Sequence, residues 1–189
     1  MTQTSSQAIW QGFHWSFFIN VQGLIISLRR FEAQLALGNL EQANIELATA
    51  TDMMLASGAS MELAGSFSRD AYETEVRTSM TPPQVRADNF SGLMSWEHAA
   101  LIQIWKQLRS VLETLPHELK PQHEKFVKAY FELAKAHRAV CEKFGGNESG
   151  SLRFDGKCAI ATLDKFKDSR LGLINPPQAS NQGCHFHIG

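Results

Sequence analysis

The sequence predicts an all-α protein, an antiparallel bundle of four main helices plus a short helix, with a long irregular C-terminal extension. Three observations support this fold class. Apolar residues recur at steps of three and four along extended segments, glycine or proline separates these segments, and no segment alternates as a half-buried strand does. At 189 residues the chain is expected to form a single helical domain, 1–189, in which 145–189 is the loop-rich extension. The predicted helices are 6–37, 39–57, 60–80, 93–115 and 121–144.

The first three helices follow from apolar stripes and the residues that separate them. The first stripe runs from Trp10 to Leu35, and Gly38 ends its helix. Asn39 is a good N-cap for the second helix, which we expect to end at Gly58. Ser60 is expected to begin the third helix, and the sequence TPP at 81–83 ends it because proline cannot continue a helix.

The fourth and fifth helices show the same spacing. The stripe of 93–115 runs from Leu93 to Leu115, and the helix 121–144 opens with Pro121 in its first turn, where proline is tolerated. Its buried face includes Tyr130 and His137. Beyond 144 only a short helix near 157–167 is expected, and the last residues are predicted to be loop or disordered.

Composition and charge exclude several classes of partner. The 18 basic and 19 acidic residues give a net charge of -1, so we expect no nucleic-acid binding and no anionic membrane surface as partner. The apolar run SFFINVQGLIISL contains Asn20, Gln22 and Gly23, which is too polar for a membrane span. Three widely spaced cysteines predict no disulfide framework, which is typical of the cytoplasm. A homo-oligomer remains open.

Two histidines stand out because they lie within apolar stripes, His14 in the first helix and His137 in the fifth. A buried imidazole without partners is costly, so each ring is either a satisfied core residue or a functional group. If both helices face one cavity, the two rings lie on opposite sides of a bound planar group. His98 is expected to be an ordinary packing residue, and His117 and His123 to face solvent.

The spacing of the histidines and glutamates gives little support for a metal site made only of protein ligands. A di-iron site in a helical bundle needs Glu-x-x-His on two helices, and this spacing does not occur. The tail carries Cys184, His185 and His187, which fall short of the four ligands of a structural site. This tail either is disordered, binds a metal or folds back over the pocket.

The segment HRAVCEKFGGNESGSLRFDGKCAIATL, which starts at His137, resembles the tryptophan 2,3-dioxygenase and indoleamine 2,3-dioxygenase superfamily. In that family an axial heme histidine is followed by a Gly/Ser-rich loop and another helix. The segment FHWSFFINVQGLIISLRRFEAQLALGNLEQA is similar to the helix on which the tryptophan enzymes carry an active-site histidine.

The resemblance implies a heme cofactor with His137 as its iron ligand and His14 as a group near the substrate. It also implies that the loop 145–151 covers the site and that Arg69 or Arg77 holds a substrate carboxylate. On sequence grounds alone, a C-cap at Gly145 followed by a flexible linker is the favoured interpretation of this loop. The cofactor-binding residues predicted beside His137 are Arg138, Gly145, Gly146, Gly150 and Ser151, and Ser149 is predicted to be catalytic with His14 and Arg77.

Physical requirements point the same way. Heme needs a neutral imidazole, an apolar slot and cations for its propionates, and Arg138 follows His137 directly. Phe13, Trp15 and Phe17 surround His14 with rings on which an aromatic substrate would stack. The sequence thus predicts a heme-dependent oxygenase that uses dioxygen on an indole-like or aromatic amine substrate. The alternative is a non-catalytic α-helical ligand-binding or protein-interaction module with structural histidines.

Overall fold

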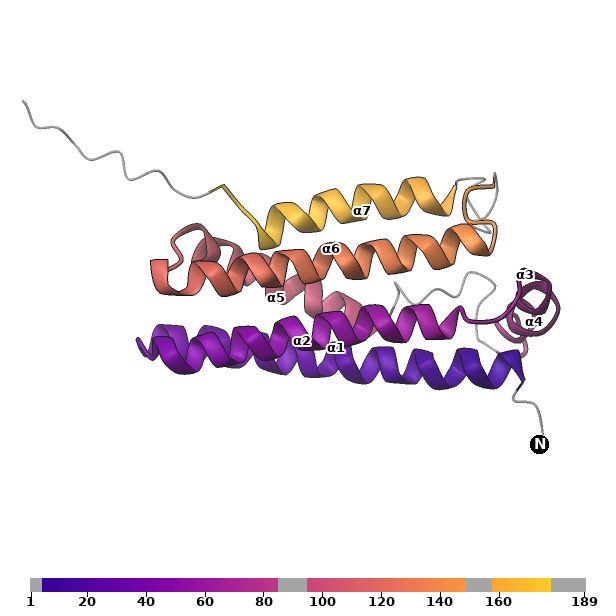
Figure 1. The fold of residues 1–189 in the computed structure, drawn as a ribbon, viewed down its shortest axis with the longest axis horizontal. Coiled ribbons are helices and arrows are strands. Elements are labelled where there is room, and N and C mark those ends of the chain that lie inside the picture. Colours follow the sequence, from indigo (N-terminus) through magenta and orange to yellow (C-terminus); the bar gives the residue numbers. More distant parts are fainter. Residues whose placement is uncertain (1–4, 85–94, 149–157, 178–189) are drawn as a thin grey trace, which may run out of the picture.

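The computed structural model describes residues 5–84, 95–148 and 158–177, and this part of the chain is helical, without strands. The all-α prediction is therefore confirmed. Five long helices make up the bundle (Figure 1): α1 Ser6–Ala36, α2 Leu40–Ala64, α5 Trp96–Glu113, α6 Lys120–Lys143 and α7 Ala159–Ile174. The 3-10 turn η3, His117–Leu119, leads directly into α6.

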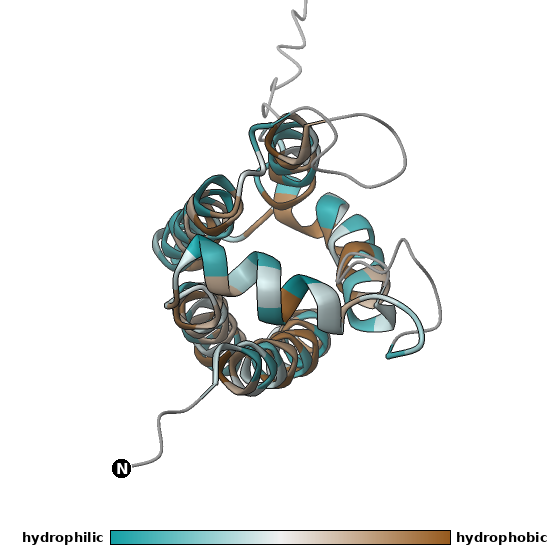
Figure 2. Ribbon diagram, turned by 90° about the vertical axis from the view of Figure 1, so that its right-hand side faces the viewer, coloured by the Kyte–Doolittle hydropathy of each residue, from teal (hydrophilic) through white to brown (hydrophobic). Residues whose placement is uncertain are grey.

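The long helices form a closed ring. α1 packs against α2, α2 against α6, α6 against α7, α7 against α5, and α5 returns to α1. Viewed along the bundle, Figure 2 shows the helices around a common centre. A short helical segment lies across the near end of the ring in this view, and it consists of α3 Arg69–Ala71, the π-helical turn η1 Tyr72–Val76 and α4 Arg77–Ser79.

Local signals fix the helix starts. The side chain of Ser5 accepts a hydrogen bond from the Ala8 amide at 3.2 Å, and Ser95 accepts one from the His98 amide at 3.2 Å. Asn39 does the same for α2, with its side chain 3.4 Å from the Gln42 amide. These contacts satisfy amide groups that the first turn of a helix leaves without partners. The predicted starts of the first two helices are confirmed to within a residue.

The prediction that the second helix ends at Gly58 and a third begins at Ser60 is wrong. α2 continues through both residues to Ala64, and the next helical segment begins only at Arg69. A Cβ atom at Gly58 would lie 3.4 Å from the Leu133 Cα. This glycine therefore permits close approach of α2 and α6 and does not terminate a helix.

The C-terminal extension is more ordered than predicted. α7 spans Ala159–Ile174, whereas only a short helix near 157–167 was expected, and it closes the ring between α5 and α6. Its end is fixed by a 2.6 Å hydrogen bond between His123 Nε2 on α6 and the Ile174 carbonyl oxygen. His123 is only 6% exposed, so the prediction that it faces solvent is wrong.

Two separate groups of buried side chains stabilise the ring. The main core occupies most of its length, with Leu24, Phe31, Leu47, Leu108 and Phe126 at its centre. A smaller group, called here the end cluster, lies near the short segment α3–α4 and consists of Met61, Val140, Phe144, Trp10, Phe67 and Tyr72. The end cluster is mostly aromatic.

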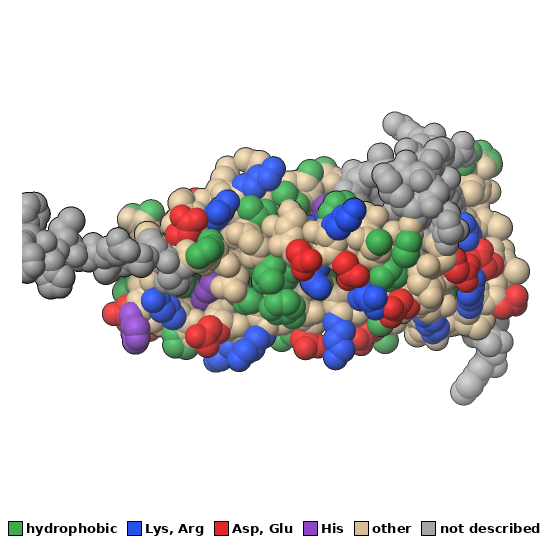
Figure 3. Space-filling view, turned by 90° about the horizontal axis from the view of Figure 1, so that it is seen from above, with side chains coloured by type: hydrophobic (Ala, Val, Ile, Leu, Met, Phe, Trp, Pro, Cys, Tyr) green, Lys and Arg blue, Asp and Glu red, His purple; other side chains and the backbone are tan. Residues whose placement is uncertain are grey.

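The surface is polar and of mixed charge. Lys, Arg, Asp and Glu side chains alternate over the face shown in Figure 3, with small apolar areas between them. Within the described residues, none of the helices has the length and apolar character needed to cross a membrane.

Candidate functional site

Two helices each place a histidine between residues of the main core and residues of the end cluster. On α1, His14 lies one turn after Trp10 of the end cluster and two turns before Val21 of the main core. On α6, His137 lies between Tyr130 of the main core and Val140 of the end cluster. His98 comes from the first turn of α5. These three residues, with Arg170 of α7, are called here the histidine cluster.

Electrostatic coupling shows that these residues share one region. The charge of Arg170 lowers the pKa of both His98 and His137, and His137 is coupled in turn to His98 and to His14. Such coupling falls off steeply with distance and solvent screening. His14 is thus near enough to His137 for its charge to affect the His137 pKa.

His137 is held neutral. Burial, followed by the charges of Arg170 and His14, lowers its pKa to about 4. The residue is half-buried. Among the described residues its ring nitrogens have no hydrogen-bond partner. A neutral imidazole with an available lone pair is the form that binds a metal ion.

His14 is oriented by its own helix. Its Nδ1 lies 3.1 Å from the Trp10 carbonyl oxygen, so Nδ1 carries the proton and donates it. The ring also packs on the Trp10 indole, with centroids 4.0 Å apart. Burial lowers the pKa of His14, and the bond to Trp10 partly offsets this. The Nε2 lone pair therefore stays available at neutral pH.

His98 is engaged differently, because Arg170 Nη2 donates a hydrogen bond to its Nε2 at 2.5 Å. The proton of this imidazole therefore resides on Nδ1. Burial, followed by the charges of Arg170 and His137, lowers its pKa to about 4. The expectation that His98 is only a packing residue missed this contact, which depends on a helix that was predicted only in part.

Trp10 connects His14 to the aromatic rings of the end cluster. Tyr72 and Phe144 stack with centroids 4.3 Å apart, and Trp10 meets both of them edge to face. Phe17 packs against both buried groups, whereas Phe13 is only partly buried. Trp15 is 71% exposed and so points away from the face of α1 that carries His14.

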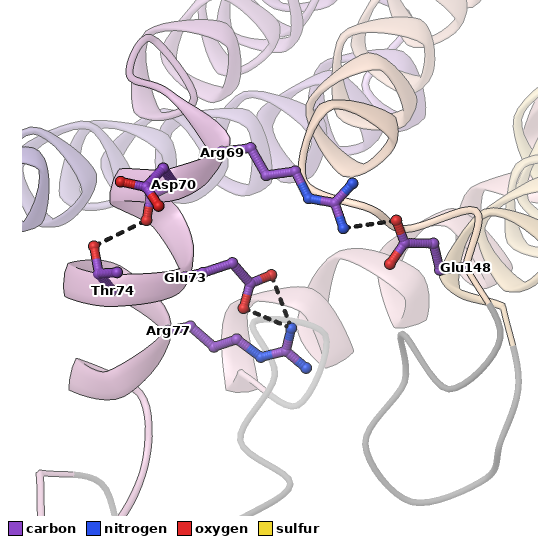
Figure 4. Close-up of polar contacts among 6 residues, drawn as sticks. All are labelled: Arg69, Asp70, Glu73, Thr74, Arg77 and Glu148. Atoms are coloured by element: carbon purple, nitrogen blue, oxygen red, sulfur yellow. Dashed lines mark hydrogen bonds and ion pairs between the residues drawn. The ribbon is translucent and has the colours of Figure 1, made fainter.

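The arginines predicted from sequence are paired with carboxylates of this chain. Arg69 on α3 lies 2.6 Å from Glu148, and Arg77 on α4 lies 3.0 Å from Glu73 (Figure 4). These side chains are between a third and three fifths exposed, so both ion pairs are at the surface. Arg138 pairs with Glu142 and Asp164.

The two glycines after α6 form its C-cap. Gly145 has a φ of 79°, and the Gly146 amide donates to the Cys141 carbonyl oxygen at 2.7 Å. A Cβ at Gly146 would lie 2.6 Å from that oxygen, so no larger residue fits. Outside the described residues lie the predicted loop residues Ser149, Gly150 and Ser151 and the tail residues Cys184, His185 and His187.

Within 5–84, 95–148 and 158–177, no group of three or more His, Cys, Asp or Glu is placed to hold a metal ion. The rings lie between two apolar groups and are neutral, and they come from separate helices. Fold and site thus define a class of protein, an all-α bundle whose interior presents neutral imidazoles beside an aromatic cluster.

Comparison with known proteins narrows this class. A sequence model described as SfmD 3-methyl-L-tyrosine peroxygenase matches residues 2–123. The chain belongs to this family. It is 27% identical over 177 residues to the 3-methyl-L-tyrosine peroxygenase of Streptomyces lavendulae. The aligned region covers 92% of this chain and 48% of that protein. The chain therefore spans about half the length of this curated relative.

The family match supports an oxygenase relationship and does not single out the tryptophan and indoleamine dioxygenases. What the two assignments share, by their names, is oxygen transfer to an aromatic substrate. No solved structure matches the chain. The finer resemblance predicted from the segment after His137 stays a prediction.

Proposed function

We propose that this protein is a heme-dependent peroxygenase that hydroxylates an aromatic amino acid of the 3-methyl-L-tyrosine type. The observation that supports this proposal most directly is His137, a neutral, half-buried histidine between two apolar groups and without a partner among the described residues. The family supplies the reaction class, since the relative from Streptomyces lavendulae is named a peroxygenase of 3-methyl-L-tyrosine.

The residues present fit a heme group. His137 would hold the iron through one ring nitrogen, and the main core and end cluster would provide the apolar surroundings that a porphyrin needs. When bound, the heme would supply the activation of the peroxide O–O bond. The overall reaction balances, because an aromatic C–H and hydrogen peroxide give a C–OH and water.

His14 is proposed to move the proton. Its Nδ1 donates a hydrogen bond to the Trp10 carbonyl oxygen, and this bond fixes the orientation of the ring. Its Nε2 can therefore accept a proton from hydrogen peroxide or from the substrate. Its lowered pKa keeps it deprotonated and therefore ready to accept at neutral pH. The aromatic rings of the end cluster exclude water and offer surfaces on which a phenol ring stacks.

The test begins with the full chain purified with an adequate supply of hemin. We expect one heme per chain with a Soret band, which His137→Ala abolishes and which His117→Ala, at an exposed turn, leaves unchanged. Turnover of 3-methyl-L-tyrosine is then followed with hydrogen peroxide, and separately with dioxygen and a reductant. A protein that takes up no hemin, or a Soret band that survives His137→Ala, refutes the proposal.

The second candidate is the non-catalytic helical module. It is favoured by the fact that His98 and His123 have structural hydrogen bonds to Arg170 and to the Ile174 carbonyl. It requires that the protein bind the aromatic ligand with no cofactor and no turnover. The hemin titration above distinguishes the two candidates directly.

A further inference from the structure

We propose that Arg170, partly buried where α7 meets α5 and α6, is a carboxylate-binding residue with its guanidinium oriented by His98 and Tyr130. The inference concerns a residue that neither the family match nor the sequence motifs single out. The choice of ligand rests on the proposed function, which supplies two possible carboxylates. These are the α-carboxylate of an amino-acid substrate and a heme propionate.

Within the part of the chain that the structure describes, the Arg170 guanidinium contacts only neutral groups. Nη2 donates to His98 Nε2 at 2.5 Å, and the guanidinium also hydrogen-bonds the Tyr130 side chain. Its central carbon lies over the Phe166 ring, 4.9 Å from the centroid. Tyr130 is fixed in turn, since its hydroxyl donates to the Lys167 carbonyl oxygen at 3.3 Å. The guanidinium is therefore held in place without a counter-charge.

The other described arginines contrast with Arg170. Arg69, Arg77, Arg109 and Arg138 each pair with a carboxylate of this chain. Arg29 and Arg30 have no such partner, but both are exposed to water. Arg170 alone among the described arginines is both partly buried and without a carboxylate. Burial of an uncompensated cation is unfavourable, and a ligand anion would remove this penalty.

The surroundings favour an anion over any other ligand at this point. The His98 ring accepts the Arg170 hydrogen bond through an Nε2 lone pair and so carries no charge, whereas the guanidinium carries a permanent positive charge. A guanidinium has five N–H donors in a planar fork, and the described contacts leave some of these free. That geometry matches the two oxygens of a carboxylate, and the bond is charge-assisted.

Position links this carboxylate site to the proposed reaction. Arg170 extends from α7 to His98 on α5 and to Tyr130 on α6, the helix that also carries the proposed iron ligand His137. A carboxylate bound here would belong to a molecule that reaches the same interior region. Both a bound amino acid and the edge of a heme satisfy this condition, and the experiment separates them.

The experiment compares matched ligands with and without a carboxylate, using the full chain and the variants Arg170→Gln, Arg170→Lys and Arg109→Gln. In the first arm, binding of 3-methyl-L-tyrosine and of 3-methyltyramine is measured by calorimetry. In the second arm, uptake of hemin and of hemin dimethyl ester is measured from the Soret band. Arg109 is an exposed arginine paired with Glu113, so its variant controls for loss of a surface charge.

We expect the wild-type protein to bind the acid about tenfold or more tightly than its carboxylate-free analogue in at least one arm, the strength of a charged hydrogen bond. Arg170→Gln should reduce that ratio to near one, Arg170→Lys should retain part of it, and Arg109→Gln should retain all of it. A preference in the first arm identifies an amino-acid carboxylate, and one in the second arm identifies a propionate.

Failure of this inference is distinguishable from failure of the proposed function. If the wild type shows no preference in either arm, or if the preference survives Arg170→Gln, the carboxylate site is refuted whether or not hemin binds. If no hemin is taken up but the first arm shows an Arg170-dependent preference, the heme proposal is refuted and the carboxylate site stands. Should Arg170→Gln fail to fold, a preference unchanged in Arg170→Lys counts against the inference.

Discussion

Acidification should destabilise the cofactor-free protein through His137, and the size of the effect follows from its burial. The ring has an ordinary pKa of 6.5 and a folded-state pKa of about 4, so protonation favours the unfolded chain. The stability that depends on a neutral His137 is therefore complete above pH 6.5 and is lost as the pH falls toward 4. Linkage gives a loss of about 2 kcal/mol between pH 7 and pH 5, and about 3 kcal/mol by pH 4.

The assay is urea unfolding of the cofactor-free chain at pH 7 and pH 5, followed by tryptophan fluorescence. His137→Leu should remove about 2 kcal/mol of the pH-dependent loss. At pH 7 it should cost little stability or add some, because the ring has no described partner to lose. His117→Leu, at an exposed position, should preserve the wild-type pH dependence. A His137→Leu variant that loses as much stability on acidification as the wild type does would refute the reasoning.

Two further substitutions test the packing of the ring. Gly65→Ala should lower stability by about 1–3 kcal/mol, since the new Cβ would lie 2.9 Å from Val140 Cγ1, and thermal unfolding followed by circular dichroism measures this loss. An unchanged melting temperature would contradict this prediction, because it would show that α6 shifts to accommodate the added Cβ atom without loss of stability. His123→Ala should cost about 1–3 kcal/mol, because it leaves the Ile174 carbonyl without its partner. Hydrogen exchange should then be accelerated mainly in α7, and uniform acceleration over all helices would contradict this local role.

Helix boundaries were predictable where the signal is local. Asn39 and Gly38 mark the turn between α1 and α2 through their own backbone and side-chain preferences, and the structure confirms both. Gly58 is the same residue type as Gly38, but it lies inside a helix and does not end one. It lies at the close contact of α2 with Leu133, a residue that is distant in sequence, and no local rule distinguishes such a glycine from a helix end.

The candidate site was predictable only in part, for a related reason. His14 and His137 stand out because each interrupts an apolar stripe, which one helix is enough to show. His98 shares its face with Leu101 and Trp105 and so looks like a packing residue. Its role depends on Arg170, which reaches it from α7 when the ring closes. Arg170 and His98 are 72 residues apart in sequence, and the spacing of residues within α5 or within α7 does not indicate a contact between them.

The three imidazoles differ in what fixes them, and this difference bears on their roles. His14 is fixed by the carbonyl of Trp10 and His98 by the guanidinium of Arg170, so each has a defined proton position within the folded chain. His137 is the most strongly desolvated of the three histidines, and no described hydrogen bond compensates for its burial. A purely structural histidine would gain from such a bond, or would be replaced by leucine at no cost. An iron atom bound to one ring nitrogen would supply the missing interaction, which is why the heme function proposed above is assigned to His137 rather than to either neighbour.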